Sequence, residues 1–218
     1  MTPQERKAAS EAYLRANGIG VFEGLPMVPP AEAVTVKPFD AVCKRAAASL
    51  IMTQAALEIG RQNYKDVGFF MQMLGTYGVR DVLNKTEQKL ASGMFEQQDV
   101  VNVVWEYECC WALFWALGLV DDIRDASAIC DCERAIHLVA DAKDMAGFQA
   151  QCRMRSTDEI LDMLDLFYRY HWACVQHKHI DPSCPVGSLN EEVVYERRRG
   201  LEWLISEEDD WHDISLDT

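Results

Sequence analysis

The chain has 218 residues, of which 49% are hydrophobic and 26% are charged, and this balance excludes a disordered polypeptide. The length fits one domain with a sizeable core. With 21 basic and 35 acidic residues the net charge is −14, and such a surface repels nucleic acid and anionic membranes, so we expect neither as a partner.

The first residues predict a helix and then an irregular arm. Thr2 is placed to cap the helix, with Pro3 at its first position and Glu5 reaching back, and Asn17-Gly18 ends it. Residues 18–38 are rich in glycine and proline, so we expect an irregular arm packed on the surface. This start has no apolar stretch of signal-peptide length, which predicts a cytoplasmic protein.

No proline interrupts the chain from Phe39 to Asp181, so this span is free to be nearly all helix. Hydrophobic spacing and capping patterns such as Ser156-Thr-Asp-Glu159 predict the helices. The expected ranges are 39–60, 63–76, 86–95, 100–117, 130–145, 146–152, 156–179 and 190–205, followed by an acidic tail at 206–218. We therefore predict one all-α domain, residues 1–218, with about eight helices in an irregular arrangement.

The apolar stretch from Val100 to Val120 is long enough to suggest a membrane span. However, Asn102, Glu106 and Glu108 lie within it, and each charge near the middle of a bilayer costs about 3 kcal/mol. We interpret residues 100–117 as the central buried helix, enclosed by the helices at 156–179 and 190–205. The eight cysteines lie mostly in such helical, apolar stretches, so we expect free thiols.

Several segments together resemble one known family. They are RKAASEAYLRANGIGVFEGLP near the start, WEYECCWALFWALGLVD at 105–121, RSTDEILDMLDLFYRYHWA at 155–173, VVYERRRGLEWL at 193–204 and the ending WHDISLDT. The chain is similar over its full length to the bacterial domain-of-unknown-function family 4272. It departs from the usual pattern at Gly200-Leu201-Glu202 and in its many cysteines. The resemblance implies no established activity, cofactor or catalytic residue.

Glu108 is the carboxylate that most needs an explanation. Its neighbours three and four positions away are all apolar, which predicts burial, whereas Glu106 is expected nearer a polar edge of the same helix. A buried carboxylate needs a cation or a proton, and Arg197 or Arg198 can supply the cation. The predicted Arg–Glu pair either fixes how two helices dock or forms part of a catalytic cleft.

Two further groups on the long helix have alternative interpretations. Asp158, Asp162, Asp165 and Arg169 share one helix face, which we interpret as solvated, with Asp165 pairing with Arg169, rather than as a site for a divalent cation. His171 borders the apolar stripe, where a hydrogen-bonded structural role is more common than catalysis.

The spacing that most resembles a metal site combines Cys174, His177, His179 and Cys184. Zinc modules usually bring their ligands as two separated close pairs, and this pattern lacks that arrangement. We therefore predict no metal and no other cofactor, and keep these four residues as weak metal candidates.

Two classes of function stay open. The acidic surface, the absence of a recognisable catalytic motif and the tail aromatic Trp211 favour a non-catalytic cytoplasmic binding or protein-interaction protein. Trp211 either folds back onto the body or anchors a partner, which is a protein partner or a second copy of the chain. The alternative is a small enzyme that uses a polar cluster of carboxylate, arginine and histidine between helices.

Overall fold

Nine α-helices and no strands make up the structure, a computed structural model that describes residues 1–218. The all-α prediction is confirmed. The helices are α1 (Pro3–Ala16), α2 (Phe39–Gly60), α3 (Tyr64–Tyr77), α4 (Lys85–Ser92), α5 (Gln97–Ala116), α6 (Cys132–Ala140), α7 (Met145–Gln151), α8 (Thr157–Val175) and α9 (Glu191–Trp203). Short 3₁₀ turns at Ala31–Ala33, Arg80–Val82 and Trp211–Asp213 and a π turn at Gln176–Ile180 complete the secondary structure.

Local side-chain chemistry sets most helix ends. The side chains of Thr2, Asn84 and Ser156 each accept a hydrogen bond from the backbone amide of a glutamate three residues later. The carboxylate of that glutamate accepts a hydrogen bond from the backbone amide of the capping residue. Gly78 and Gly93 end α3 and α4 in the left-handed conformation, which glycine adopts without steric cost. Regular α-helix in α8 stops at Val175, and the π turn continues it to Ile180, one residue beyond the predicted end.

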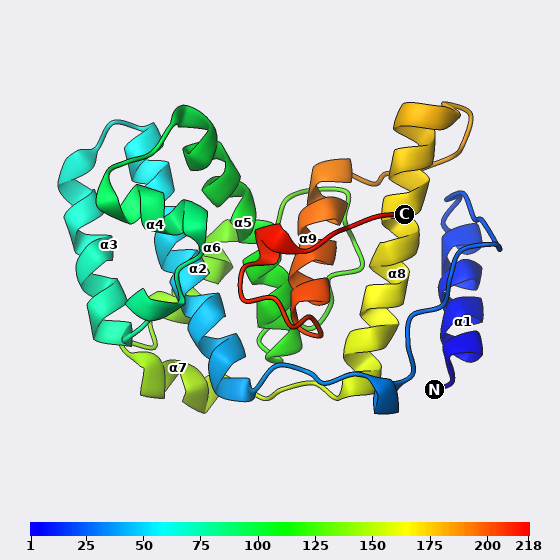
Figure 1. Ribbon diagram of the computed structural model, residues 1–218, viewed down its shortest axis with the longest axis horizontal. Helices are drawn as coiled ribbons and strands as arrows, with labels where there is room; N and C mark the ends of the chain where they lie inside the picture. The colour runs from blue at the N-terminus through cyan, green and yellow to red at the C-terminus, as the bar shows by residue number, and fades with distance from the viewer.

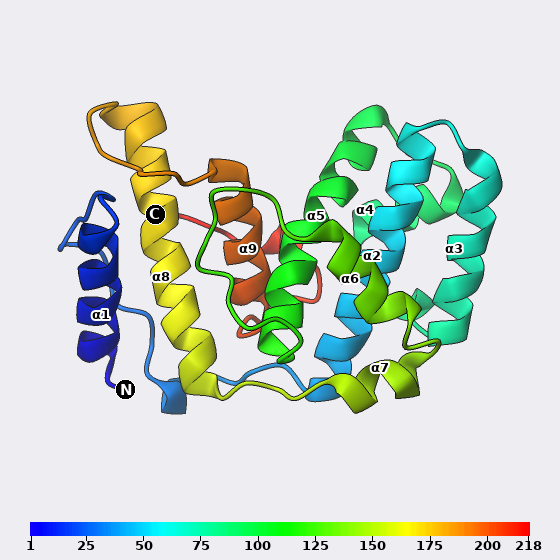
Figure 2. The ribbon, with the colours of Figure 1, turned by 180° about the vertical axis from the view of Figure 1, so that it is seen from behind.

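The long helices lie side by side in a row (Figures 1 and 2). Contacts run from α1 to α8, α9, α5, α2 and finally α3. Helix α5 is central, as predicted, but its flanking helices are α9 and α2. The expectation that the long helix α8 packs directly on α5 is wrong, because α9 lies between them.

Shorter elements cover the two faces of this row. Helix α4 and the segment after α9 lie on the face toward the viewer in Figure 1, while α6, α7 and the loop at 118–131 lie on the other (Figure 2). The arm at 18–38 runs along one edge from α1 to α2, as expected of an irregular segment. It is tied to the end of α9, because the Lys37 amide donates to the Leu204 carbonyl at 2.8 Å.

One apolar core extends through the whole molecule. It comprises 52 buried residues, from Leu14 in α1 to Trp211 near the C-terminus, and on α5 every side chain from Glu106 to Ala116 is buried. Helix α9 approaches α5 closely at Gly200, where an added Cβ would lie 2.7 Å from the Cys109 carbonyl oxygen. The glycine therefore permits this helix crossing.

The prediction of a solvated charged face on α8 is wrong at Asp165 and Arg169, whereas Asp158 and Asp162 are partly exposed. Asp165 and Arg169 are 0% and 1% exposed and form the expected ion pair. The Arg169 guanidinium donates two hydrogen bonds to the Asp165 carboxylate, at 2.8 and 2.9 Å. Arg6, which is also buried, bonds Asp158 at 3.1 Å and Asp162 at 2.7 Å. Because α1 packs on α8, Asp158 and Asp162 bind Arg6 of α1, while their own side chains remain 48% and 37% exposed.

The acidic tail folds back onto the body. Trp211 is 1% exposed and packs edge-on against Trp203, with 6.2 Å between ring centroids. The Arg45 guanidinium lies over its ring at 4.7 Å. Trp211 is thus a core residue, and the tail aromatic that supported a protein-interaction role in the sequence is not exposed.

The fold leaves all eight cysteines as free thiols. None of the helices combines the length and the apolar character that crossing a membrane requires.

Candidate functional site

The predicted Arg–Glu pair exists between Arg197 and Glu108. Their side chains are 3% and 1% exposed, and Nε of Arg197 donates to Oε2 of Glu108 at 2.8 Å. The Cys130 amide donates to the other carboxylate oxygen at 2.6 Å, and Arg197 also donates to the carbonyls of Ile123 and Asp125. The pair is sealed and fully bonded, so it joins α5, α9 and the 118–131 loop and offers no group to a ligand.

Arg198 and His171 form a second buried contact. The Arg198 guanidinium donates to Nδ1 of His171 at 2.6 Å and to the Leu216 carbonyl at 3.0 Å. Burial, together with the nearby Arg198 charge, lowers the pKa of His171 to about 4, so the imidazole is neutral and accepts this bond. Its acceptor nitrogen is occupied, and the contact positions the last residues of the chain.

The weak metal candidates do not come together as a site. Cys174 is buried in the core, His179 is exposed on the π turn, and Nδ1 of His177 bonds the Cys184 carbonyl at 2.8 Å. No group of three or more histidine, cysteine or acidic side chains in the chain is arranged to hold a metal ion.

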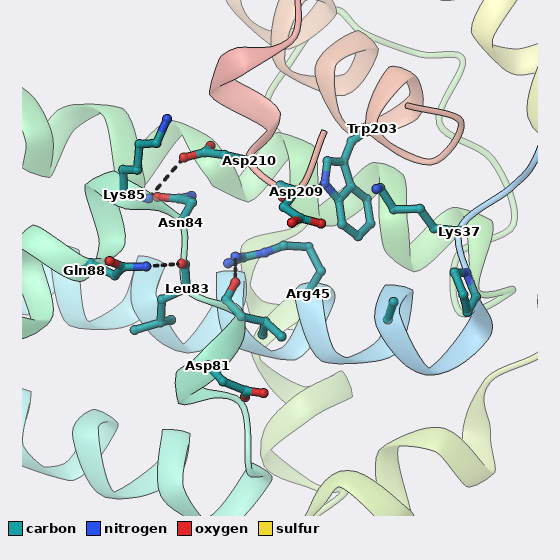
Figure 3. A pocket seen from close by; sticks show the side chains of 13 residues that line it. Lys37, Arg45, Asp81, Leu83, Asn84, Lys85, Gln88, Trp203, Asp209 and Asp210 are labelled. Atoms are coloured by element: carbon teal, nitrogen blue, oxygen red, sulfur yellow. Dashed lines mark hydrogen bonds between the residues drawn. The ribbon is translucent and has the colours of Figure 1, made fainter. Parts of the chain in front are cut away.

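A polar cleft of about 570 Å³ lies elsewhere, between α2, the 80–85 turn, α4 and the segment after α9 (Figure 3). We call it the polar cleft. Its charged and amide side chains come from segments far apart in the chain: Lys37, Arg45, Asp81, Asn84, Lys85, Gln88, Asp209 and Asp210, with Trp203 forming part of the wall.

The two ends of the polar cleft differ. In Figure 3, Lys37 and Trp203 lie at one end, with the Lys37 ammonium 4.8 Å from the indole ring, and Lys85 lies at the other. Asp210 is held at the Lys85 end, because it accepts hydrogen bonds from the Lys85 and His212 amides at 3.1 and 2.9 Å.

Four charged side chains of the polar cleft have no ion-pair partner: Lys37, Asp81, Asp209 and Asp210. Asp210 is held by two backbone amides, which leaves Lys37, Asp81 and Asp209 free. Lys85 and Arg45 each have an ion-pair partner. Lys85 pairs with Asp213 at 2.7 Å, and Arg45 pairs with the buried Glu87. The free charges are therefore one cation and two carboxylates.

A buried polar network lies directly behind Arg45 and Asn84. Glu87 and Glu106 are both 0% exposed. Asn84 donates to Oε1 of Glu106 at 2.9 Å, and the His212 ring contacts the same oxygen at 2.9 Å. Residues of α2, α4, α5 and the C-terminal segment therefore surround the carboxyl groups of Glu87 and Glu106.

These two carboxyl groups share a single neighbouring cation. Burial, opposed by the Arg45 charge, raises the pKa of Glu87 to about 8 and that of Glu106 to about 7. Burial works against the charge on Arg45, but Glu87 outweighs it and raises the Arg45 pKa. Burial therefore disfavours the charged form of both carboxyl groups, and Oε2 of Glu106 has no hydrogen-bond partner.

Sequence reasoning missed this network and placed Glu106 at a polar edge. The prediction was wrong because α4 and His212 cover that edge with partners that helical neighbours in α5 do not reveal. One signal was available: Asn84-Lys-Thr-Glu87 is a capping-box pattern that marks the start of α4 and brings Glu87 to its first turn.

A protein family described as "Domain of unknown function (DUF4272)" matches residues 6–214. The chain belongs to this family. No curated protein and no solved structure matches it significantly. Membership in the DUF4272 family transfers no residue role, so the chemistry of the polar cleft has to carry the functional argument.

Proposed function

We propose that this DUF4272 member is a non-catalytic cytoplasmic binding protein whose polar cleft holds a small ligand carrying an amine, such as a basic amino acid. The observation that carries the proposal is the set of unpaired charges in the polar cleft. Asp81 and Asp209 can accept hydrogen bonds from an ammonium or guanidinium group, and Lys37 can bind a carboxylate. A volume of about 570 Å³ is within the range of small-molecule sites.

The electrostatics of the chain favour a cationic group in the ligand. The net charge of −14 attracts cations from solution, and two free carboxylates outnumber the one free ammonium in the polar cleft. Arg45 does not compensate, because its charge is already paired with Glu87. An amine with a second, anionic group would satisfy all three free charges.

Calorimetric titration with lysine, arginine, putrescine and glutamate tests the proposal. We expect lysine or arginine to bind more tightly than glutamate. Asp209→Asn should weaken that binding about tenfold or more, since a hydrogen bond to a charged group contributes about 1.5–3 kcal/mol. Asp141→Asn is the matched control, because Asp141 is exposed at the end of α6 and away from the polar cleft. Equal affinity of wild type and Asp209→Asn, or preference for glutamate, would refute the proposal.

Native mass spectrometry of the protein from a gentle lysate supplies an independent test. A mass excess equal to an amine metabolite supports the proposal, and the copy number shows whether the protein is a homo-oligomer. A mass excess equal to a metal ion, or a stable complex with another protein and no small ligand, would contradict it.

The free thiols support the cytoplasmic location, because reduced cysteine is typical of reducing compartments. The proposal involves no cofactor, no nucleic acid and no membrane.

An enzyme is the second candidate, and the Glu87–Glu106 pair is the observation that favours it. Carboxyl groups with pKa values of about 8 and 7 are suited to exchange protons near neutral pH. Both are fully buried behind Arg45 and Asn84, which argues against direct contact with a ligand. If the bound ligand is consumed, as followed by NMR, and Glu106→Gln stops its consumption without weakening its binding, the catalytic alternative is correct.

A further inference from the structure

A second pocket lies between α2, α3 and α6, and it differs from the polar cleft in chemistry. Its volume is about 460 Å³, and nine of its twelve lining residues are hydrophobic. They include Leu50 and Ile51 from α2, Phe69, Phe70 and Met73 from α3, and Ile136 from α6. We call it the apolar pocket. It shares no lining residue with the polar cleft.

Helix α3 contributes apolar side chains that the hydrophobic core covers only in part. Only Leu74 and Tyr77 of its fourteen residues are buried. Phe69 is 60% exposed at the apolar pocket, and Phe70 and Met73 are half-buried. Apolar surface gathered around a concavity is typical of a binding site, because a folded chain gains by removing it from water.

The polar groups of the apolar pocket are satisfied within the protein, with one exception. Gln54 donates to the Tyr107 hydroxyl, Thr76 to the Gln72 carbonyl, and Tyr77 to the Val139 carbonyl. These groups need nothing from a ligand.

The exception is Lys143, which lines the apolar pocket and is exposed. Its ammonium makes no ion pair, although the chain carries an excess of 14 negative charges. Its backbone has φ of +70°, a left-handed conformation that few residues other than glycine adopt. Such strain is found more often at functional positions than elsewhere.

We propose that the apolar pocket binds a small molecule with an aliphatic or aromatic body and one carboxylate, whose apolar part lies among the α2, α3 and α6 side chains and whose carboxylate pairs with Lys143. The volume of the apolar pocket is within the range of about 300–1,000 Å³ that small-molecule sites occupy. A single cation at the edge of an apolar cavity selects an amphiphilic anion over a neutral or cationic amphiphile. This inference is independent of the amine ligand proposed for the polar cleft.

Calorimetric titration with butanoate, hexanoate, octanoate and decanoate, each below its micelle concentration, tests the apolar contacts. Affinity should rise about fourfold for each added methylene group until the apolar pocket is full, as expected for burial in an apolar site. Octylamine, which has the same chain and the opposite charge, should bind at least about tenfold more weakly than octanoate. Affinity that does not depend on chain length, or equal binding of octylamine, would overturn the proposal.

Two variants test whether octanoate binds in the apolar pocket. Lys143→Asn removes the charge and keeps a residue that tolerates positive φ, so octanoate should bind about tenfold more weakly while octanol binds as before. Met73→Glu places a carboxylate in the wall at a half-buried position and should abolish octanoate binding. Met94→Glu, the same change at a residue 76% exposed outside the pocket, is the matched control. Octanoate affinity unchanged in Lys143→Asn would refute the role of Lys143 even if Met73→Glu fails to fold.

Size-exclusion chromatography distinguishes the other occupants of such a surface. If the protein forms a dimer that Met73→Glu dissociates and octanoate does not affect, a second copy of the chain covers the apolar pocket and the small-molecule proposal is wrong.

Discussion

Replacing Arg197 by methionine leaves Glu108 as a buried carboxylate without a cation. Removal of one member of a buried, hydrogen-bonded ion pair costs about 3–5 kcal/mol. The pair also holds the 118–131 loop, since Arg197 donates to the Ile123 and Asp125 carbonyls, and methionine offers no donor in its place. We therefore expect the upper part of this range.

Thermal and urea unfolding followed by circular dichroism measure this loss. For a chain of this size each kcal/mol shifts Tm by about 2–4 °C, so Arg197→Met should lower Tm by about 10 °C or more. Arg153→Met is the control, because Arg153 is exposed and makes no ion pair, and its effect should stay within about 0.5 kcal/mol.

A double variant separates the pair interaction from simple loss of packing. Glu108→Leu alone leaves Arg197 buried and unpaired, whereas Glu108→Leu combined with Arg197→Met removes both charges. The double variant should therefore be destabilised by less than the sum of the two single variants, by about 1–3 kcal/mol. If Arg197→Met changes the free energy of unfolding by less than about 1 kcal/mol, or if the two effects add, the assignment of Glu108 and Arg197 as a sealed structural pair is wrong.

Three further predictions concern the network and the core. The raised pKa values of Glu106 (about 7) and Glu87 (about 8) make the native state hold more protons than the unfolded chain above pH about 5, so stability should fall as pH rises toward 8. Glu106→Gln should flatten this fall between pH about 5 and 7, where native Glu106 keeps a proton that the unfolded chain has lost, and identical slopes in that range would contradict the assignment. Trp211→Ala should lower the free energy of unfolding by about 3–5 kcal/mol in urea titrations, and a loss below 1 kcal/mol would mean that the tail does not pack on the core in solution. Gly200→Ala should destabilise the protein by about 1–3 kcal/mol, because the added Cβ would collide with α5. The control is Gly68→Ala, whose Cβ meets nothing within 4 Å and which should stabilise α3 by up to about 1 kcal/mol. If Gly200→Ala stabilises the protein, α5 and α9 are not in close contact.

The helices and their ends followed from local chemistry that can be read along the chain. The absence of proline after Phe39 allows long helices, and the caps at Thr2 and Ser156 depend only on residues within one turn. The all-α fold and most helix boundaries could therefore be predicted. The burial of Glu108 and its pairing with an arginine could also be predicted, because its neighbours three and four positions away are apolar and a buried carboxylate requires a cation or a proton.

The candidate site depended on contacts between segments that lie far apart. Asp81 on one turn, Arg45 on α2 and Asp209 after α9 carry no common pattern in the sequence, and they line one cleft only because the C-terminal segment folds back across α2.

Local sequence therefore decided which residues form helices, because capping and hydrophobic periodicity act within about four residues. Tertiary structure alone decided which partners the buried charges meet. Glu106 and Glu108 are two positions apart on one helix, and both are buried, yet one meets Arg197 and the other meets Asn84 and His212. Their different partners depend on the helices packed against each side of α5, because burial of a side chain depends on what covers its face of the helix.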